Sequence, residues 1–246
     1  MFRFIVLFGL IQLFATGDVA AQLPLKTKST INKTEAIRSA YRREAKQSAL
    51  VTPPLLAKKA FIVLDPGHGG SDAGTQSISK PRYQEKSLNL MTAHFVQNFL
   101  QEQGYHVIMT RNDDTFISLE KRAQWANEQQ PDLFVSIHYN AAPSAEAQGI
   151  EVFYYSAKEN KSRTIQSKKL AQTILRNLVN QTHAKSRGVK VGNYAVIRET
   201  NMPAILVEGG FVTNEAEMQK LKDPLYLKQI AWGIVKGINE YLTNKK

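Results

Sequence analysis

The 246-residue sequence contains no cysteine. This absence excludes disulfides, and it excludes a lipid anchor attached to an N-terminal cysteine. It also excludes thiolate metal ligands, so any bound transition metal must rely on histidine, aspartate or glutamate side chains. Long hydrophobic runs are missing as well. The apolar stretch at residues 4–14 falls short of the roughly 20 residues that a membrane-spanning helix needs.

The first 21 residues have the pattern of a secretory signal peptide. Arg3 supplies a positive charge, the apolar stretch follows, and small residues at positions 19–21 precede a cleavage point. An uncleaved membrane anchor is the alternative interpretation. We therefore expect an exported protein with no stable membrane insertion once the signal is removed.

Charge of one sign predominates, with a formal net charge of +11 and a pI of about 9.7. Such a charge favours polyanionic partners, namely nucleic acid, an anionic membrane surface or an anionic wall polymer. The export signal argues against nucleic acid, and we expect no nucleic-acid partner. The alternative is that the charge only aids solubility. Residues 22–59 are rich in lysine and arginine, and we interpret them as a basic N-terminal extension.

From residue 60 onward, strand signals alternate with helix signals. Short apolar, β-branched runs predict strands at 60–65, 105–110, 133–138, 150–155, 194–198 and 204–208. Apolar residues at helical spacing predict helices at 88–99, 118–130, 162–182 and 227–242. Strands separated by helices are typical of a largely parallel sheet covered on both faces. We therefore predict one α/β domain over residues 60–246.

Four residues at element ends could carry chemistry. His68 follows the first predicted strand, His138 ends the third, and Glu208 ends the last. Glu85 stands where the first long helix begins. The carboxyl ends of parallel strands meet at one edge of a sheet, where active sites usually lie. Two imidazoles and one carboxylate are a common ligand set for a catalytic metal, and a further carboxylate can accept a proton from the attacking water.

Simpler explanations exist for each of these residues. A histidine in a glycine-rich turn is often only a hydrogen-bonded surface residue, and an acid such as Glu85 is favoured at a helix N-terminus by the helix dipole. The loop 67–74 could cradle phosphate, but it lacks the Gly-Lys-Ser/Thr ending of a P-loop, and the short HExxH zinc motif is absent from the chain. We expect the remaining histidines to pack or to face solvent: His94, His106 and His183.

Five stretches share the motifs of a known enzyme family, in a preserved order between about residues 61 and 242. They are Leu64–Gly70 with Asp72 and Gly74; Glu85-Lys86 with Asn89-Leu90; Thr110-Arg111 with Asp114, Leu119, Arg122, Ala126 and Asn127; Ser136–Ala141; and Arg198–Thr200 with Met202–Ala204, Glu208–Phe211 and Asn214. Together they resemble the zinc-dependent N-acetylmuramoyl-L-alanine amidases, in the type 3 catalytic domain. Any one motif is weak, but the set is specific.

The resemblance implies Zn²⁺ held by His68, Glu85 and His138, with Glu208 as the catalytic glutamate. It implies a peptidoglycan substrate, cleaved between the lactyl group of N-acetylmuramic acid and L-alanine of the stem peptide. The implied fold is a twisted, mostly parallel sheet of about six strands flanked by helices on both faces. The implied location is the periplasm or the extracellular cell wall.

Two departures from the family pattern stand out. Tyr139 occupies a position where a small residue is common, and we expect its ring to narrow the cleft or to add stacking. The stretch 76–84 lacks the usual glycines, which leaves its conformation open. Some family members carry a helix that plugs the zinc site until an activator removes it. The chain between His138 and Glu208 leaves no room for such a plug, so we expect that no activator protein is required.

A second activity is a separate hypothesis. Ser77 and Lys80 match the Ser-x-x-Lys nucleophile motif of penicillin-binding proteins, which would give a serine-type carboxypeptidase. The same pattern occurs at 118–121, no Lys-Thr-Gly follows, and a polar loop at the rim of the cleft is the simpler interpretation. Two rivals to the amidase also remain: a zinc peptidase acting on the stem peptide alone, and an inactive wall-binding module.

Overall fold

The computed structural model describes residues 59–244, so the predicted signal peptide and nearly all of the basic extension lie outside the described residues. The described part contains six strands and six helices. Along the chain they are β1 (Phe61–Pro66), α2 (Glu85–Glu102), β2 (His106–Met109), α3 (Leu119–Gln129), β3 (Leu133–Asn140), β4 (Ile150–Tyr154), α4 (Lys161–Thr182), β5 (Ser186–Val191), α5 (Ala195–Arg198), β6 (Ala204–Phe211), α6 (Glu215–Leu221) and α7 (Pro224–Thr243).

The strands form a single sheet in the order β2-β1-β3-β6-β4-β5. Neighbouring strands are parallel except for β4 and β6, which pair antiparallel. The prediction of a mostly parallel sheet of about six strands is therefore confirmed. The single antiparallel pair matters for the site, because it places a β4 residue directly beside a β6 residue near the carboxyl end of β6.

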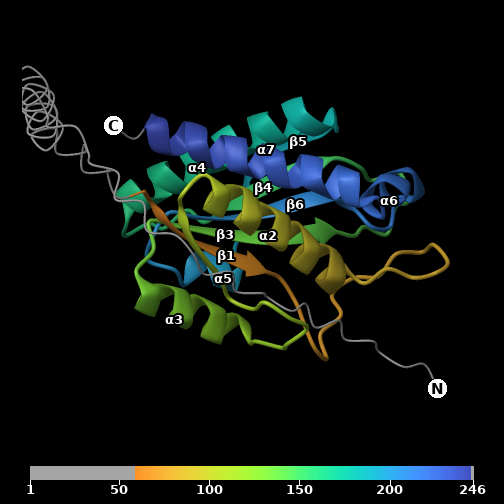
Figure 1. The fold of residues 1–246 in the computed structure, drawn as a ribbon, viewed down its shortest axis with the longest axis horizontal. Coiled ribbons are helices and arrows are strands. Elements are labelled where there is room, and N and C mark those ends of the chain that lie inside the picture. Colours follow the sequence, from red (N-terminus) through yellow and green to blue (C-terminus); the bar gives the residue numbers. More distant parts are fainter. Residues whose placement is uncertain (1–58, 245–246) are drawn as a thin grey trace, which may run out of the picture. The chain divides into compact units, whose positions relative to one another are not determined.

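Helices cover both faces of the sheet, as predicted (Figure 1). Helices α2, α4 and α7 pack on one face, and α3 and α5 pack on the other. Side chains alternate between the two faces along each strand. In β3, Val135 and Ile137 point toward the first group of helices, whereas Phe134 points toward α3 and α5. His138 lies four positions after Phe134 in the same strand, so its side chain points to the same face, toward α3 and α5.

The C-terminal helix shows why the core is stable. The Asp223 side chain caps α7 by accepting a bond from Leu225 N–H, and Pro224 fills the first helical position, where no backbone donor is lost. Apolar residues at helical spacing, among them Ile230 and Ile234, are fully buried. This apolar face packs within the domain. Within residues 59–244, no helix is long and apolar enough to cross a bilayer.

Two short elements were missed and one was assigned wrongly from the sequence. The predicted strand at 194–198 is wrong, because Tyr194 caps the one-turn helix α5, which the following four residues form. A four-residue apolar run is too short for periodicity to separate helix from strand. The edge strand β5 was missed because its sequence is polar and its residues are only half-buried. Helix α6 was missed although Asn214, accepting from Glu217 N–H, is an N-cap of the expected type.

A buried ion pair joins α3 to the end of β1. Arg122 Nη1 donates to Asp65 Oδ1 at 2.8 Å, and both residues are at least 98% buried. The same guanidinium donates to the carbonyls of Pro66 and His68. Burial raises the pKa of Asp65, but the charge and hydrogen bond of Arg122 outweigh this effect and hold the pKa below its ordinary value. Arg122 therefore fixes the loop that carries His68.

We expect Arg122→Met to lower the free energy of unfolding by about 3–5 kcal/mol near neutral pH, because it leaves the Asp65 carboxylate buried and uncompensated. Urea unfolding measures this, with the exposed neighbour Lys121→Met as the control. A carboxyl with a lowered folded-state pKa stabilises the fold above the unfolded-state value of about 3.9 and loses this effect as the pH falls through its folded-state pKa. The gap between wild type and variant should therefore narrow below about pH 4. A loss under 1 kcal/mol would contradict the assignment.

Candidate functional site

Three side chains from distant parts of the chain converge at the carboxyl edge of the sheet. His68 lies in the loop after β1, Glu85 is the first residue of α2, and His138 lies in β3. Glu85 Oε2 is 3.2 Å from His68 Nε2, and Glu85 Oε1 is 2.9 Å from His138 Nδ1. One ligand atom from each residue lies within 4.8 Å of the other two. The structure thus brings together the three residues that the sequence suggested as metal ligands.

The electrostatics of this group suit a divalent cation. Burial raises the pKa of Glu85, but its hydrogen bonds with His138 and His68 outweigh burial and hold the pKa well below the ordinary value. Burial lowers the pKa of His68, but its hydrogen bonds to Glu85 and Asp72 and their charges outweigh burial, so the pKa lies above its ordinary value. A buried, ionised carboxylate between two imidazoles therefore attracts positive charge. The donor set fits zinc, since it has two nitrogen ligands and one oxygen ligand and leaves a further position open.

A second carboxylate orients His68 from behind. Asp72 Oδ2 is 2.7 Å from His68 Nδ1, and Gly74 N–H donates to Asp72 Oδ1 at 3.0 Å. With Nδ1 bonded to the carboxylate, Nε2 faces Glu85. Carboxylates in this position fix the ring orientation and increase the basicity of the ligating nitrogen. The sequence placed Asp72 within a motif but gave it no role, although its spacing of four residues from His68 was the available signal.

We expect Asp72→Asn to weaken zinc binding by about 10- to 100-fold, the usual cost of removing such a carboxylate. Competition with a chromogenic chelator measures the affinity directly, without a turnover assay. Glu159→Gln, at an exposed carboxylate outside the site, removes the same charge and should leave the affinity unchanged. An affinity equal to that of wild type in Asp72→Asn would show that His68 needs no carboxylate to orient it.

Two glycines allow the candidate metal ligands to lie close to the backbone of the loop after β1. A Cβ at Gly67 would lie 2.0 Å from Cε1 of His138, so the imidazole packs directly on this backbone. A Cβ at Gly74, whose φ is +64°, would lie 2.6 Å from both Glu85 Oε2 and His68 Cδ2. Larger residues at either position would displace these side chains. The glycines of the loop therefore serve the close approach rather than phosphate binding.

A second buried arginine ties the loop to the helix that carries Glu85. Arg111 is 3% exposed, and its Nη2 donates to the carbonyls of Gly67 and Lys86 at 2.8 Å each. Asn89, one turn after Glu85, donates to the same Gly67 carbonyl at 3.1 Å. Together with Arg122, these bonds hold the loop after β1 and the first turn of α2 in one position. The sequence identified both arginines as motif residues without indicating this positioning role.

Glu208 lies beside the three converging residues. It is the register partner of His138 in the neighbouring strand β6, and it is 8% exposed. Its Oε2 atom is buried and has no hydrogen-bond partner among the described residues. Burial raises the pKa of Glu208 well above the ordinary value, and the charges of Glu85 and Glu151 raise it further. A buried carboxyl without partners is costly unless it serves a function.

The four residues open into a cleft with largely apolar walls. One hollow of about 310 Å³ is lined by all four, and an adjoining hollow of about 400 Å³ shares His68 and His138. Three large side chains stay partly exposed along these walls: Phe116, Leu119 and Tyr194. Few polar groups in an apolar cleft are typical of a ligand site.

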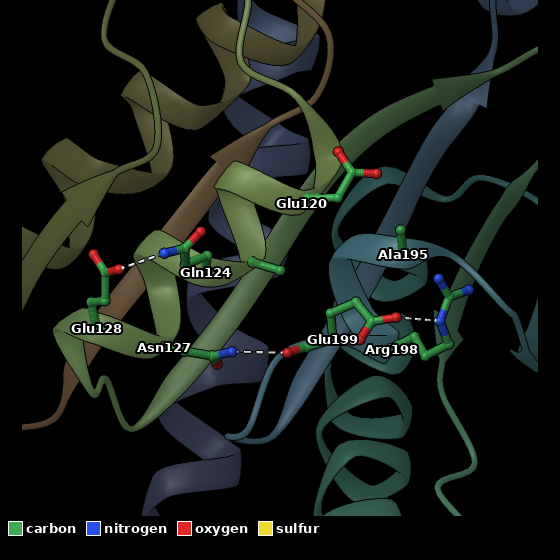
Figure 2. A pocket seen from close by; sticks show the side chains of 8 residues that line it. Glu120, Gln124, Asn127, Glu128, Ala195, Arg198 and Glu199 are labelled. Atoms are coloured by element: carbon green, nitrogen blue, oxygen red, sulfur yellow. Dashed lines mark hydrogen bonds and ion pairs between the residues drawn. The ribbon is translucent and has the colours of Figure 1, made fainter.

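A larger hollow of about 570 Å³ lies between α3 and α5 (Figure 2). Its polar lining is tied together by short bonds. Asn127 donates to the Glu199 carbonyl at 2.8 Å, and Arg198 Nε donates to the Glu199 carboxylate at 2.6 Å. None of the converging residues lines it. We therefore assign the functional site to the smaller cleft, because chemistry and not volume distinguishes it.

The comparison with known proteins decides the family. Residues 62–240 match the family described as N-acetylmuramoyl-L-alanine amidase. The chain belongs to this family. A crystal structure of N-acetylmuramoyl-L-alanine amidase from Clostridium difficile 630 is similar to it, with 42% identity and a TM-score of 0.72 over 77% of this chain and 100% of that one.

Two further relatives add context to the amidase fold. The CwlD amidase of Clostridioides difficile, in complex with the GerS lipoprotein, is 30% identical, with a TM-score of 0.70 over 76% of this chain and 100% of that chain. The probable cell wall amidase LytH of Staphylococcus epidermidis is 34% identical over 80% of this chain. The matched region spans 62% of the length of LytH, so that relative is substantially longer.

Tyr139 corrects one expectation about this amidase domain. Its side chain is 1% exposed, and its hydroxyl lies 2.6 Å from Thr92 Oγ1 of α2. The ring therefore packs in the core between the sheet and α2, on the opposite face from His138. Tyr139 borders the cleft, but its ring lies in the core, so the prediction that the ring narrows the cleft is wrong. Burial raises the pKa of the Tyr139 hydroxyl well above its ordinary value.

The proposed second nucleophile lies in a closed loop. Ser77 is 2% exposed, its Oγ accepts from Tyr83 N–H at 2.8 Å, and it shares a hydrogen bond with Ser79 Oγ at 2.9 Å. Lys80 is exposed. Within residues 59–244, no hydrogen bond joins Ser77 to Lys80. A serine peptidase activity here stays a prediction, and labelling wild type and Ser77→Ala with a fluorescent penicillin tests it.

The other histidines lie away from the cleft, as expected. His94 Nε2 is 3.2 Å from the Asn112 carbonyl, and exposed His106 stacks on Phe61 with ring centroids 4.2 Å apart. His183 is exposed and ends α4 in the left-handed conformation. None of the three belongs to the group that could hold a metal in the described part of the chain.

Proposed function

We propose that this protein is a zinc-dependent peptidoglycan hydrolase that cleaves the amide between N-acetylmuramic acid and L-alanine of the stem peptide. One observation carries the proposal: His68, Glu85 and His138 converge within 4.8 Å, with the buried Glu208 carboxyl beside them in a cleft. Family membership supports the choice of bond. The known amidase structures to which the chain is similar support it as well.

In this proposal His68, Glu85 and His138 hold the zinc ion. When bound, zinc supplies Lewis acidity, which activates water as a nucleophile and polarises the amide carbonyl. Glu85 contributes the negative charge of the ligand set. Asp72 keeps His68 in the orientation in which Nε2 faces the metal position, and the buried arginines keep the loop from shifting.

Glu208 performs the proton transfers. As water adds to the carbonyl carbon, the Glu208 carboxylate accepts a proton from the water. The carboxyl then donates that proton to the alanine nitrogen as the carbon–nitrogen bond breaks, which leaves a lactyl carboxylate and a free amine. Burial and the charges of Glu85 and Glu151 raise the pKa of Glu208, which makes its carboxylate a stronger base toward the attacking water. Oε2 has no hydrogen-bond partner among the described residues, so no internal bond competes with the proton transfer there.

We propose further that the enzyme is exported, acts in the periplasm or the extracellular wall, and requires no activator. In the described part of the chain, the segment between β3 and β6 forms β4, α4, β5 and α5, and none of these helices fills the cleft. The CwlD structure contains the GerS lipoprotein, so the activity of this protein without any partner is the quantity to measure. Hydrolysis by the purified protein alone supports independence, whereas an inert protein rescued by a partner contradicts it.

New amino termini distinguish the proposal from its rivals. Purified peptidoglycan is incubated with the protein, and free amino groups are labelled and identified. The amidase exposes the amino group of L-alanine. A zinc peptidase acting on the stem peptide alone would instead expose other residues, with the peptide still joined to the sugar. A wall-binding module would expose none.

A further inference from the structure

Beyond the metal-binding group, the same face of the sheet continues with charged side chains. The register pairs His138 of β3 with Glu208 of β6, and Glu208 with Glu151 of β4. Directly paired residues point to the same face. Arg187 and Lys190 follow on β5, the edge strand, and both reach back to Glu151 Oε2. A row of functional groups therefore runs across four adjacent strands, starting at the candidate metal ligand.

The far end of this row carries excess positive charge. Glu151 is 3% exposed, whereas the side chains of Arg187 and Lys190 are 32% and 40% exposed. Two cations share one carboxylate, so the group has a net charge of +1. Arg187 Nε donates to Glu151 at 3.0 Å, Nη1 donates to the Gln148 carbonyl at 3.5 Å, and the guanidinium lies over the Phe211 ring. Within residues 59–244, Nη2 has no hydrogen-bond partner. The two cations are therefore accessible to solvent, whereas the carboxylate that binds them is buried.

Contacts join this cationic pair to the cleft at two points. Asn140, which lines the cleft, donates to Glu151 Oε1 at 2.7 Å. Lys190 lies over the Phe153 ring, and Phe153 packs edge-on against Tyr194, another residue of the cleft wall. The pair is therefore continuous with the cleft on its β5 side. Phe116 and Leu119 line the opposite, α3 side and carry no charge.

We propose that Arg187 and Lys190 bind a carboxylate of the stem peptide, and so set the direction in which substrate lies across the site. The inference rests on the proposed amidase function and deepens it. Arginine matches the geometry of a carboxylate and is weakly hydrated, which favours this recognition. The peptide then runs from Glu208 toward β5, and the sugar lies on the apolar side beside α3.

The reach of a short peptide agrees with this arrangement. Adjacent strands lie about 4.8 Å apart, so a group one to two strands beyond Glu208 is roughly 5–10 Å away. An extended peptide advances about 3.3–3.6 Å per residue. A carboxylate on the second residue of the stem peptide, where a γ-linked glutamate leaves its α-carboxylate free, falls within that span.

Binding of two matched dipeptides tests the subsite without requiring turnover. L-alanyl-D-glutamate γ-methylamide, whose γ-carboxyl is blocked as it is in the stem peptide, carries the free α-carboxylate, and the corresponding α-amide does not. Calorimetry with the zinc-loaded protein should show wild type preferring the acid by about tenfold or more. Arg187→Gln or Lys190→Gln should remove most of this preference by weakening the acid alone, and Arg187→Lys should retain part of it. Each single variant leaves one cation on Glu151, and thermal unfolding confirms folding.

The controls match both kinds of contact. Arg176→Gln breaks a similar arginine–glutamate pair with Glu240, and Lys228→Gln removes a lysine that lies over the Phe95 ring. Both should bind the two peptides as wild type does. A wild-type protein that does not distinguish acid from amide overturns the inference. A preference that survives in Arg187→Gln and Lys190→Gln overturns it as well. The inference also fails if these two residues contribute to the binding of an anionic wall polymer but not to that of the dipeptide.

Hydrolysis of an N-acetylmuramoyl dipeptide, measured in parallel, separates this inference from the proposed function. Wild type that cleaves neither the acid nor the amide form contradicts the amidase proposal. Wild type that cleaves both, with the same ratio of rates in Arg187→Gln, contradicts only the carboxylate subsite. If the inference holds, the variants raise KM for the acid form about tenfold and leave kcat nearly unchanged, because binding is lost and the reacting groups stay in place.

Discussion

Glu208→Gln is expected to lose nearly all peptidoglycan hydrolysis, by a factor of about 100 to 10,000, and to keep its zinc. A positioned acid–base group typically contributes acceleration of this order. Glutamine has nearly the same size, so the packing around the buried side chain should persist, but it cannot accept or return a proton. Dye release from labelled peptidoglycan measures turnover, and elemental analysis measures zinc in the same samples.

The exposed-site variant Glu159→Gln is the matched control, since it makes the same change outside the cleft. It should retain full activity and full zinc content. Two outcomes would contradict the role of Glu208. Retained activity in Glu208→Gln would mean that another group moves the proton. Loss of zinc from Glu208→Gln would mean that Glu208 belongs to the metal-binding set instead.

His138→Ala is expected to lose both zinc and activity, because it removes one of three ligands and leaves Glu85 buried with a single imidazole. Zinc that binds only the folded protein stabilises it by about 4 kcal/mol at a free concentration 1,000 times the dissociation constant. Added zinc should therefore raise the Tm of the metal-free wild-type protein by several degrees. The Tm of His138→Ala should barely change.

His94→Ala provides the comparison, since His94 bonds to the Asn112 carbonyl outside the cleft. Its zinc content, its activity and the rise of its Tm with zinc should match those of wild type. A His138→Ala protein that binds one equivalent of zinc with unchanged affinity would exclude the proposed ligand set, whatever its activity.

Much of this site could be predicted because its residues stand at the ends of helices and strands that the sequence pattern indicates clearly. His68 and His138 follow buried apolar runs, and a parallel sheet necessarily brings such ends to one edge. Glu85 was less certain from chemistry alone, because a helix-start acid has a simple explanation in the dipole. The structure shows that it also lies within 3.2 Å of both imidazoles.

The residues that position the site were harder to predict. Arg111 and Arg122 act through bonds to backbone carbonyls, and the partners of such bonds depend on how loops pack rather than on sequence spacing. Tyr139, by contrast, could have been placed correctly. It follows His138 directly in a strand, and alternation alone puts neighbouring side chains on opposite faces. The expectation rested on the size of the Tyr139 side chain and not on the face of the strand to which its position assigns it.

The charged group on β4 and β5 shows a further limit. The sequence 186–191 has polar side chains and a glycine, and such edge strands lack the apolar run that periodicity detects. Without β5, neither Arg187 nor Lys190 could be placed beside the cleft. The antiparallel pairing of β4 with β6, which sets Glu151 next to Glu208, was also outside a simple alternation of strands and helices.

We infer that His68, Glu85 and His138 hold zinc beside Glu208, and that this site hydrolyses one specific amide bond. Mass spectrometry of the fragments from purified peptidoglycan tests it most directly, using metal-free protein, the same protein restored with one equivalent of zinc, and restored protein with excess chelator. We expect intact stem peptides beginning with L-alanine, together with sugar strands bearing a free lactyl carboxylate, only in the zinc-restored sample. Fragments cut within the stem peptide, or the same products in all three samples, would contradict it.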